Sequence, residues 1–147
     1  MNALDLSKYI ISKCYNDENP ISNLQLQKIL YFLYGHFYSH YSKSIFGDDF
    51  VAWRFGPVVK DVYFEFNKYI SDPITENFDV DLSSEFNTEE VRFINNEIET
   101  LAHESTWELV KKSHSTSPWK ETFCDGYGEG HTIPKYKINK YFFEQEL

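Results

Sequence analysis

Two histidines four residues apart are the first pattern in this chain that could support chemistry. His36 and His40 have the spacing that lets two imidazoles on one helix face share a metal ion. A zinc hydrolase of the HExxH type needs a glutamate directly after the first histidine, and Phe37 stands there instead. No third ligand is evident nearby in the sequence. We therefore expect no metal site and no cofactor, and interpret both histidines as residues at the rim of a core.

A thiol–imidazole pair is the second candidate for chemistry. Cys124 with His131 or His114 has the residue types of a nucleophile and its base. One cysteine and some histidines are weak evidence without geometry, and no pair of acidic residues stands in an obviously apolar setting that would raise a carboxyl pKa. We predict no catalytic residue and no enzymatic activity.

Three glycines lie close together over residues 126–130 and suggest a phosphate-binding loop. The segment lacks the Gly-Lys-Ser/Thr ending of a P-loop and does not match the dinucleotide-binding fingerprint. It also contains Glu129, which would repel phosphate. The pattern therefore predicts a flexible surface loop over residues 124–131.

Aromatic residues and an arginine point to contact with another macromolecule. Trp and Arg are the residue types most enriched at interface hot spots, and Trp53 and Arg54 are adjacent. We expect a strand over residues 50–55, on which neighbouring side chains face opposite sides, so that not all of residues 53–55 can point inward. Trp53 could equally be a core residue. For His114 and Trp119, a structural role in packing is preferred and a role in partner contact is the alternative. The predicted partner-binding residues are Trp53, Arg54, Phe55, His114 and Trp119.

Length and composition predict one domain. The chain has 147 residues, 41% hydrophobic and 18% aromatic, which suffices for a core and excludes a disordered chain. No apolar run reaches the roughly 20 residues of a membrane span, and the first residues lack the features of a signal peptide. The 2 cysteines fit a reducing compartment. We expect a single domain over residues 1–147 in the cytoplasm.

The charge balance predicts the kind of partner. With 14 basic and 23 acidic residues, the formal net charge is −9, which repels phosphate backbones and favours basic proteins. The lysines at 135, 137 and 140 are followed at once by Glu144 and Glu146, so they indicate a solvated helix face. The sequence disfavours nucleic acid as a partner and leaves self-association open.

The most apolar stretch predicts a buried central helix over residues 23–41. Ser22 is placed to accept from the backbone N–H of Gln25, whose side chain can reach back, which gives a capping box. Apolar residues then fill most helix faces, including Leu26, Leu30 and Leu33. A helix that is apolar on most faces is buried rather than resting on a surface.

The elements after the central helix follow from turn residues. We expect the strand over residues 50–55 to pair with residues 74–82, where apolar and acidic residues alternate. Gly56 can take backbone angles that other residues avoid, and Pro57 suits the first position of the next helix.

The remaining caps complete a mainly α (α+β) fold. About six or seven helices are expected to pack around the central one, with a small two- or three-stranded β element. Two of the other helices are expected over residues 3–15 and 134–146. Two more are expected to begin at capping boxes: one at Asn87 with Glu90, and one at Ser105 with Glu108, which carries Trp107, Leu109 and Val110. A short helix is expected to begin at Ser117, with Ser117 as its cap and Pro118 at its first position.

Three segments also carry a resemblance to a known family. They are residues 26–32 (Leu-Gln-Lys-Ile-Leu-Tyr-Phe), residues 52–59 (Ala-Trp-Arg-Phe-Gly-Pro-Val-Val) and residues 109–119, which end in Ser-Pro-Trp. Together they resemble the SocA-like antitoxin family, also called the Panacea domain. The resemblance covers nearly the whole chain, and residues 52–59 are its most specific part.

The resemblance implies a binding protein: the antitoxin of a toxin–antitoxin pair, acting by stoichiometric contact. It also implies that toxins vary within the family, so that the scaffold does not identify the partner. From the acidic charge we expect a basic toxin. The alternatives are a phage or mobile-element accessory protein that inhibits or escorts a host factor, and a metal-dependent hydrolase using His36, His40 or His114.

Overall fold

The computed structural model of the chain describes residues 1–145, which form seven α-helices and one two-stranded antiparallel sheet. This architecture confirms the prediction of a mainly helical fold with a small β element. Glu146, placed by the sequence in the last helix, lies outside the described residues. The elements are α1 (Ala3–Asn16), α2 (Asn23–Tyr41), β1 (Val51–Trp53), β2 (Gly56–Val58), α3 (Lys60–Phe66), α4 (Thr88–Ala102), α5 (Thr106–His114), α6 (Ser117–Phe123) and α7 (Lys135–Gln145).

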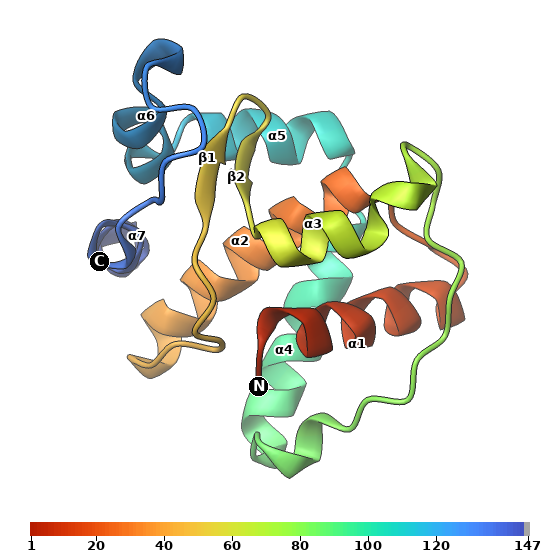
Figure 1. The fold of residues 1–147 in the computed structure, drawn as a ribbon. Coiled ribbons are helices and arrows are strands. Elements are labelled where there is room, and N and C mark those ends of the chain that lie inside the picture. Colours follow the sequence, from red (N-terminus) through yellow and green to blue (C-terminus); the bar gives the residue numbers. More distant parts are fainter. Residues whose placement is uncertain (146–147) are drawn as a thin grey trace.

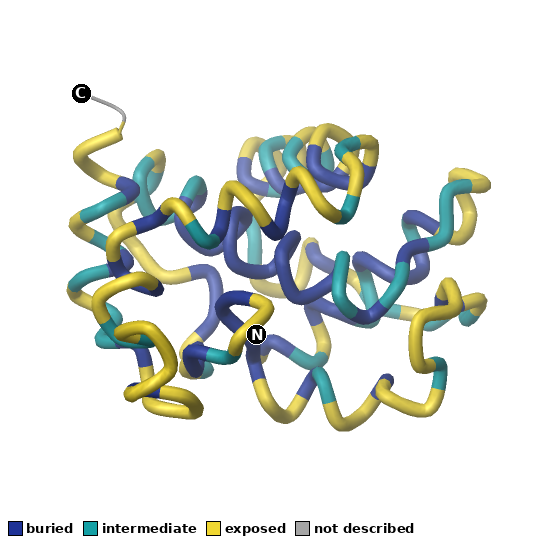
Figure 2. Tube along the Cα trace, turned by 90° about the horizontal axis from the view of Figure 1, so that it is seen from above, coloured by how far each residue is buried: buried dark blue, intermediate teal, exposed yellow. Residues whose placement is uncertain are grey.

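Helix α2 runs through the middle of the molecule, as its apolar sequence predicts. Helices α1, α4, α5 and α7 and strand β2 pack against it (Figure 1). Figure 2 shows the buried parts of the chain gathered inside and the exposed parts around the periphery. Buried side chains occur on most faces of α2, because its neighbours surround it. None of the helices in residues 1–145 has the length and apolar character needed to cross a membrane.

The predicted cap of α2 is correct in one half and wrong in the other. The hydroxyl of Ser22 accepts from the N–H of Gln25 at 3.2 Å, but the Gln25 side chain donates to the carbonyl of Ala102 at 3.1 Å. Ala102 ends α4, where carbonyl groups lack partners within the helix and attract outside donors. The capping box of Asn87 and Glu90 is confirmed, since each side chain accepts from the other residue's N–H.

The β element pairs differently from the prediction. Strand β1 pairs with β2, and residues 54 and 55 form the turn between them. Residues 74–82, the predicted partner strand, form no strand: residues 74–81 are irregular and Leu82 begins a short 3-10 helix. The N–H of Ile74 donates to the carbonyl of Ile21. A two-residue turn brings two strands together locally, so no distant segment is needed.

The two prolines of the motifs occupy positions other than those predicted. Pro57 lies in β2, and α3 begins only at Lys60. In α6, Pro118 is the second residue, and Thr116 rather than Ser117 is the N-cap residue. The missing N–H costs little at Pro118, because N–H groups in the first helical turn have no partner within the helix. It costs little at Pro57, because β2 is an edge strand.

The loop predicted over residues 124–131 is tied to the sheet at its end. The N–H of Ala52 donates to the carbonyl of His131 at 2.9 Å, and the Ala52 carbonyl accepts from the N–H of Gly130 at 2.7 Å. A β-bridge between the adjoining residues continues this pairing. Strand β1 therefore has backbone partners on both sides, and the prediction of a flexible loop is wrong for these residues.

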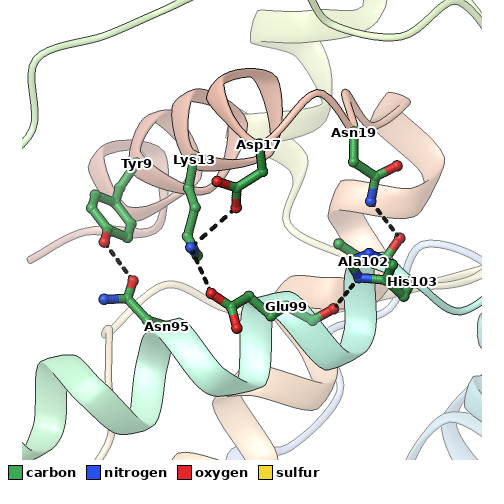
Figure 3. A network of polar contacts seen from close by, with 8 residues as sticks. All are labelled: Tyr9, Lys13, Asp17, Asn19, Asn95, Glu99, Ala102 and His103. Atoms are coloured by element: carbon green, nitrogen blue, oxygen red, sulfur yellow. Dashed lines mark hydrogen bonds and ion pairs between the residues drawn. The ribbon is translucent and has the colours of Figure 1, made fainter.

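Polar contacts join α1 to α4 along one side (Figure 3). The Tyr9 hydroxyl donates to the side chain of Asn95. Lys13 bridges Asp17 on its own helix and Glu99 on α4, at 3.1 and 3.0 Å. Half-exposed ion pairs of this kind each contribute only ~0–1 kcal/mol, so they mainly orient α1 on a contact that apolar burial stabilises.

Gly35 of α2 lies against Phe142 of α7, and we predict that Gly35→Ala lowers the free energy of unfolding. A methyl group at Gly35 would overlap the Phe142 ring, which the rings of Tyr31 and Phe32 hold in place. Overpacking of this kind costs ~1–3 kcal/mol, more than the gain of about 1 kcal/mol at most in helix propensity. Urea unfolding of both proteins measures the difference.

The double variant Gly35→Ala/Phe142→Leu is the control for this contact. Its loss of stability should be smaller than the sum of the two single losses, because the smaller side chain makes room for the methyl group. A Gly35→Ala protein as stable as the original would contradict the close approach of α2 and α7.

Candidate functional site

Three polar side chains interrupt the apolar sequence of α2 and face the hairpin and α3. We call Asn23, Gln27 and Lys28 the polar ladder; all three are buried. The Gln27 amide donates to the side chain of Asn23 at 3.1 Å, and Asn23 in turn donates to the carbonyl of Tyr63 in α3 at 3.0 Å. The ladder thus satisfies buried polar groups with one another and with backbone, as burial requires.

The other two contacts of the ladder hold strand β2. The side-chain oxygen of Gln27 accepts from the N–H of Val59 at 2.9 Å. The amine of Lys28 donates to the carbonyl of Pro57, also at 2.9 Å. Both bonds join a side chain of the central helix to backbone, so they fix the position of the hairpin whatever its side chains are.

The Lys28 amine is the most unusual group of the site because its side chain is 0% exposed. Burial lowers the pKa of Lys28 from 10.5 to about 7, since leaving water disfavours the charged form. The neutral amine is therefore far more populated near neutral pH than for an exposed lysine. A neutral amine can donate to the Pro57 carbonyl without the cost of an unpaired buried charge.

Gly56 fits tightly between Lys28 and Ser113. A Cβ atom at Gly56 would lie 2.6 Å from Nζ of Lys28 and 2.7 Å from Oγ of Ser113. Its φ of 115° also belongs to the region that side chains disfavour. Two independent constraints, space and backbone angle, therefore require glycine at the start of β2.

Helices α5 and α6 lie beside the hairpin (Figure 1). Between them they carry a stack of aromatic rings that supports it. The ring of Trp119 stacks on His114 with 4.3 Å between centroids, and on Phe123 with 4.7 Å. Nε1 of Trp119 donates to the carbonyl of Trp53 at 2.9 Å. Because Trp119 is buried, this hydrogen bond fixes the end of β1 from the interior of the protein.

His114 is held in its neutral form. Burial lowers its pKa, and the positive charge of Lys28 acts in the same direction. The backbones of Arg54 and Phe55 oppose this shift with a smaller effect. Nε2 is shielded from solvent and makes no hydrogen bond of standard geometry with the described residues. His114 thus serves the hairpin as a packed ring.

The turn of the hairpin is the exposed part of the site. Arg54 and Phe55 both face solvent, and the guanidinium of Arg54 lies over the Phe55 ring at 4.9 Å. Trp53 is half-buried and packs edge-on against Tyr63, with 4.8 Å between centroids. The prediction that all three alternate along a strand is wrong, because residues 54 and 55 form the turn.

Two hollows adjoin the turn. The Trp107 hollow, of about 590 Å³, lies among the starts of α2 and α5 and the end of α3, and its apolar lining comprises Leu24, Phe55, Tyr63, Ile70 and Trp107. The Glu129 hollow, of about 500 Å³, includes in its lining Trp53, Arg54, Phe55, Tyr63, Phe123 and Glu129. Phe55 and Tyr63 border both, so they form a ridge between the two hollows.

The structure gathers all five predicted partner-binding residues around the hairpin turn, and their role stays a prediction. The histidines of the zinc hypothesis are engaged elsewhere: His36 bonds Glu97 on α4 at 2.7 Å, and His40 stacks on Phe93. Within residues 1–145, no three His, Cys, Asp or Glu side chains are grouped to hold a metal ion.

Sequence reasoning missed the ladder and the Trp107 hollow. The pair Gln27 and Lys28 in an otherwise apolar helix was a usable signal, because buried polar residues need partners. Trp107, which the sequence placed only as a residue of its helix, faces solvent. Nothing in the sequence indicated that Ile70 is exposed.

Comparison with known proteins places this arrangement in a family. Residues 26–120 match the family described as "Antitoxin SocA-like, Panacea domain", a span that includes Lys28, the hairpin and Trp119. The chain belongs to the SocA-like antitoxin family, as its motifs predict. "Antitoxin SocA" of Caulobacter vibrioides (strain NA1000 / CB15N) is 29% identical over 138 residues, covering 87% of this chain and 73% of that protein. No solved structure matches the chain.

The lowered pKa of Lys28 makes stability depend on pH, and we predict that Lys28→Met removes this dependence. Between pH 7 and 10.5 the unfolded chain binds a proton at Lys28 that the folded chain has largely released. Stability therefore rises with pH across this window, by up to about 1.4 kcal/mol per pH unit. Urea unfolding of both proteins at pH 7, 8 and 9 gives the slopes.

Only the difference between the two proteins counts in this experiment, because other groups that titrate here are common to both. Lys28→Met should gain on the original at low pH and lose that advantage as the pH rises. Parallel slopes would show that the amine is not buried as described.

Proposed function

We propose that the chain neutralises a cognate toxin by stoichiometric protein–protein contact, without catalysis, and that the hairpin turn is the centre of the interface. The observation that carries this proposal is an exposed turn, Arg54 and Phe55, whose flanking backbone is fixed by Lys28 and Trp119. A fixed turn loses little freedom on binding, so more of the contact energy becomes affinity. Arginine and aromatic residues are also frequent hot spots.

The interface extends beyond the turn itself. A stable complex buries roughly 1,200–2,000 Å², which two residues cannot supply. The hollows on either side provide the additional surface. The net charge of −9 favours a basic toxin, with association that weakens as salt is added. Cys14 and Cys124 are both free thiols, which supports action in the cytoplasm.

We predict that Arg54→Ala leaves the fold intact and weakens neutralisation. Arg54 is exposed, and its guanidinium lies over the Phe55 ring and makes no ion pair among residues 1–145, so its loss costs little stability. The loss in affinity should be about tenfold or more if it is a hot spot. Growth of cells that co-express the product of the adjacent gene measures neutralisation, and thermal unfolding measures stability.

The matched control is Tyr127→Ala, which removes an aromatic side chain that is also exposed but borders neither hollow. It should neutralise as well as the original. The proposed function fails if the original chain neither rescues growth nor forms a complex with the adjacent gene product. Full neutralisation by Arg54→Ala would remove the turn from the interface.

A further inference from the structure

We propose that the Trp107 hollow accepts an apolar anchor of the toxin, a segment with one or two large apolar side chains flanked by Lys or Arg. This inference rests on the proposed function and specifies the chemistry of the partner segment. It concerns Leu24, Ile70 and Trp107, which sequence reasoning did not assign to any site.

The lining of the hollow is uncharged. None of the ten described residues that line it is Asp, Glu, Lys, Arg or His, although a quarter of the chain is charged. Two polar residues of the lining are engaged inside the fold: Ser22 caps α2, and Asn23 belongs to the polar ladder. A pocket with this lining favours aliphatic or aromatic side chains, since a charged group would find no partner there.

Large apolar side chains are exposed at the hollow. Ile70 is 82% exposed, Trp107 is 67% exposed and Phe55 is 44% exposed. They come from three separate segments: the short 3-10 turn that follows α3, the start of α5 and the hairpin turn. Exposed apolar residues scattered singly are ordinary, whereas several gathered at one concave place mark a contact surface.

The backbone of Ile70 is strained. Its φ of 56° and ψ of −112° lie in a region that β-branched residues rarely adopt. Such strain costs free energy and persists where the residue has a role that offsets it. Burial within this chain does not provide that role, because the side chain is exposed. Contact with a partner does.

Charge identifies the occupant as a basic partner rather than a second copy of the chain. Two copies would bring −9 against −9. Asp72 and Glu108 adjoin lining residues, are exposed, and make no ion pair among residues 1–145. The nearby ammonium of Lys68 lies 5.5 Å over the ring of Tyr69. Asp72 and Glu108, each next in sequence to a lining residue, can pair with basic side chains that flank the anchor.

Two variants test the inference against the purified product of the adjacent gene. Trp107→Ala should weaken the measured affinity roughly 30-fold, as loss of a central tryptophan does. Ile70→Gly should weaken it about tenfold while thermal stability stays equal or rises, because glycine relieves the strained backbone. A residue with a purely structural role would instead lower stability. Tyr127→Ala serves again as the control and should bind as the original does.

The outcomes separate this inference from the proposed function. If the original chain binds the toxin and both variants bind equally well, the hollow is not the anchor site, while the proposed function stands. If the original chain does not bind, both fail. Light scattering of the chain alone tests whether a second copy of the chain occupies the hollow. A dimer that Trp107→Ala dissociates would assign the hollow to that copy and overturn the inference.

Discussion

A lysine amine buried against one carbonyl oxygen is the contact on which the rest of the site depends. Lys28 lies within the most buried helix, and its bond to Pro57 sets the position of β2 along that helix. An apolar side chain of similar size would fill the space but leave the Pro57 carbonyl without this donor. The polar choice therefore selects one position of the hairpin, at the cost of burying an amine.

The buried and the exposed residues of the candidate site have different roles. Lys28 and Trp119 hold the hairpin backbone by hydrogen bonds. The ring of His114, which burial keeps neutral, packs on Trp119. Arg54 and Phe55 take no part in this support and face solvent. Because the support acts on backbone atoms, the exposed side chains can vary without disturbing it.

The sequence predicted the elements better than their connections. Local signals were sufficient for α2 and for the capping box of Asn87 and Glu90, because these depend on neighbouring residues. The Gln25 side chain was misassigned because its acceptor, the Ala102 carbonyl, lies on a distant helix. For the candidate site, the tryptophan, arginine and phenylalanine at residues 53–55 were enough to predict a contact surface there. The buried state of Lys28 and the exposure of Ile70 depend on tertiary packing, which no local pattern contains.

The hydrogen bonds on both sides of the hairpin have a consequence for how a partner can be recognised. One side of β1 pairs with β2 and the other with the segment ending in His131 and Thr132. The Pro57 carbonyl in β2 and the N–H of Val59, the residue after β2, are occupied by side chains of α2. A partner therefore cannot dock here by strand addition, the sequence-tolerant route that relies on main-chain pairing. A partner that binds the hairpin would therefore have to recognise side-chain shape and charge.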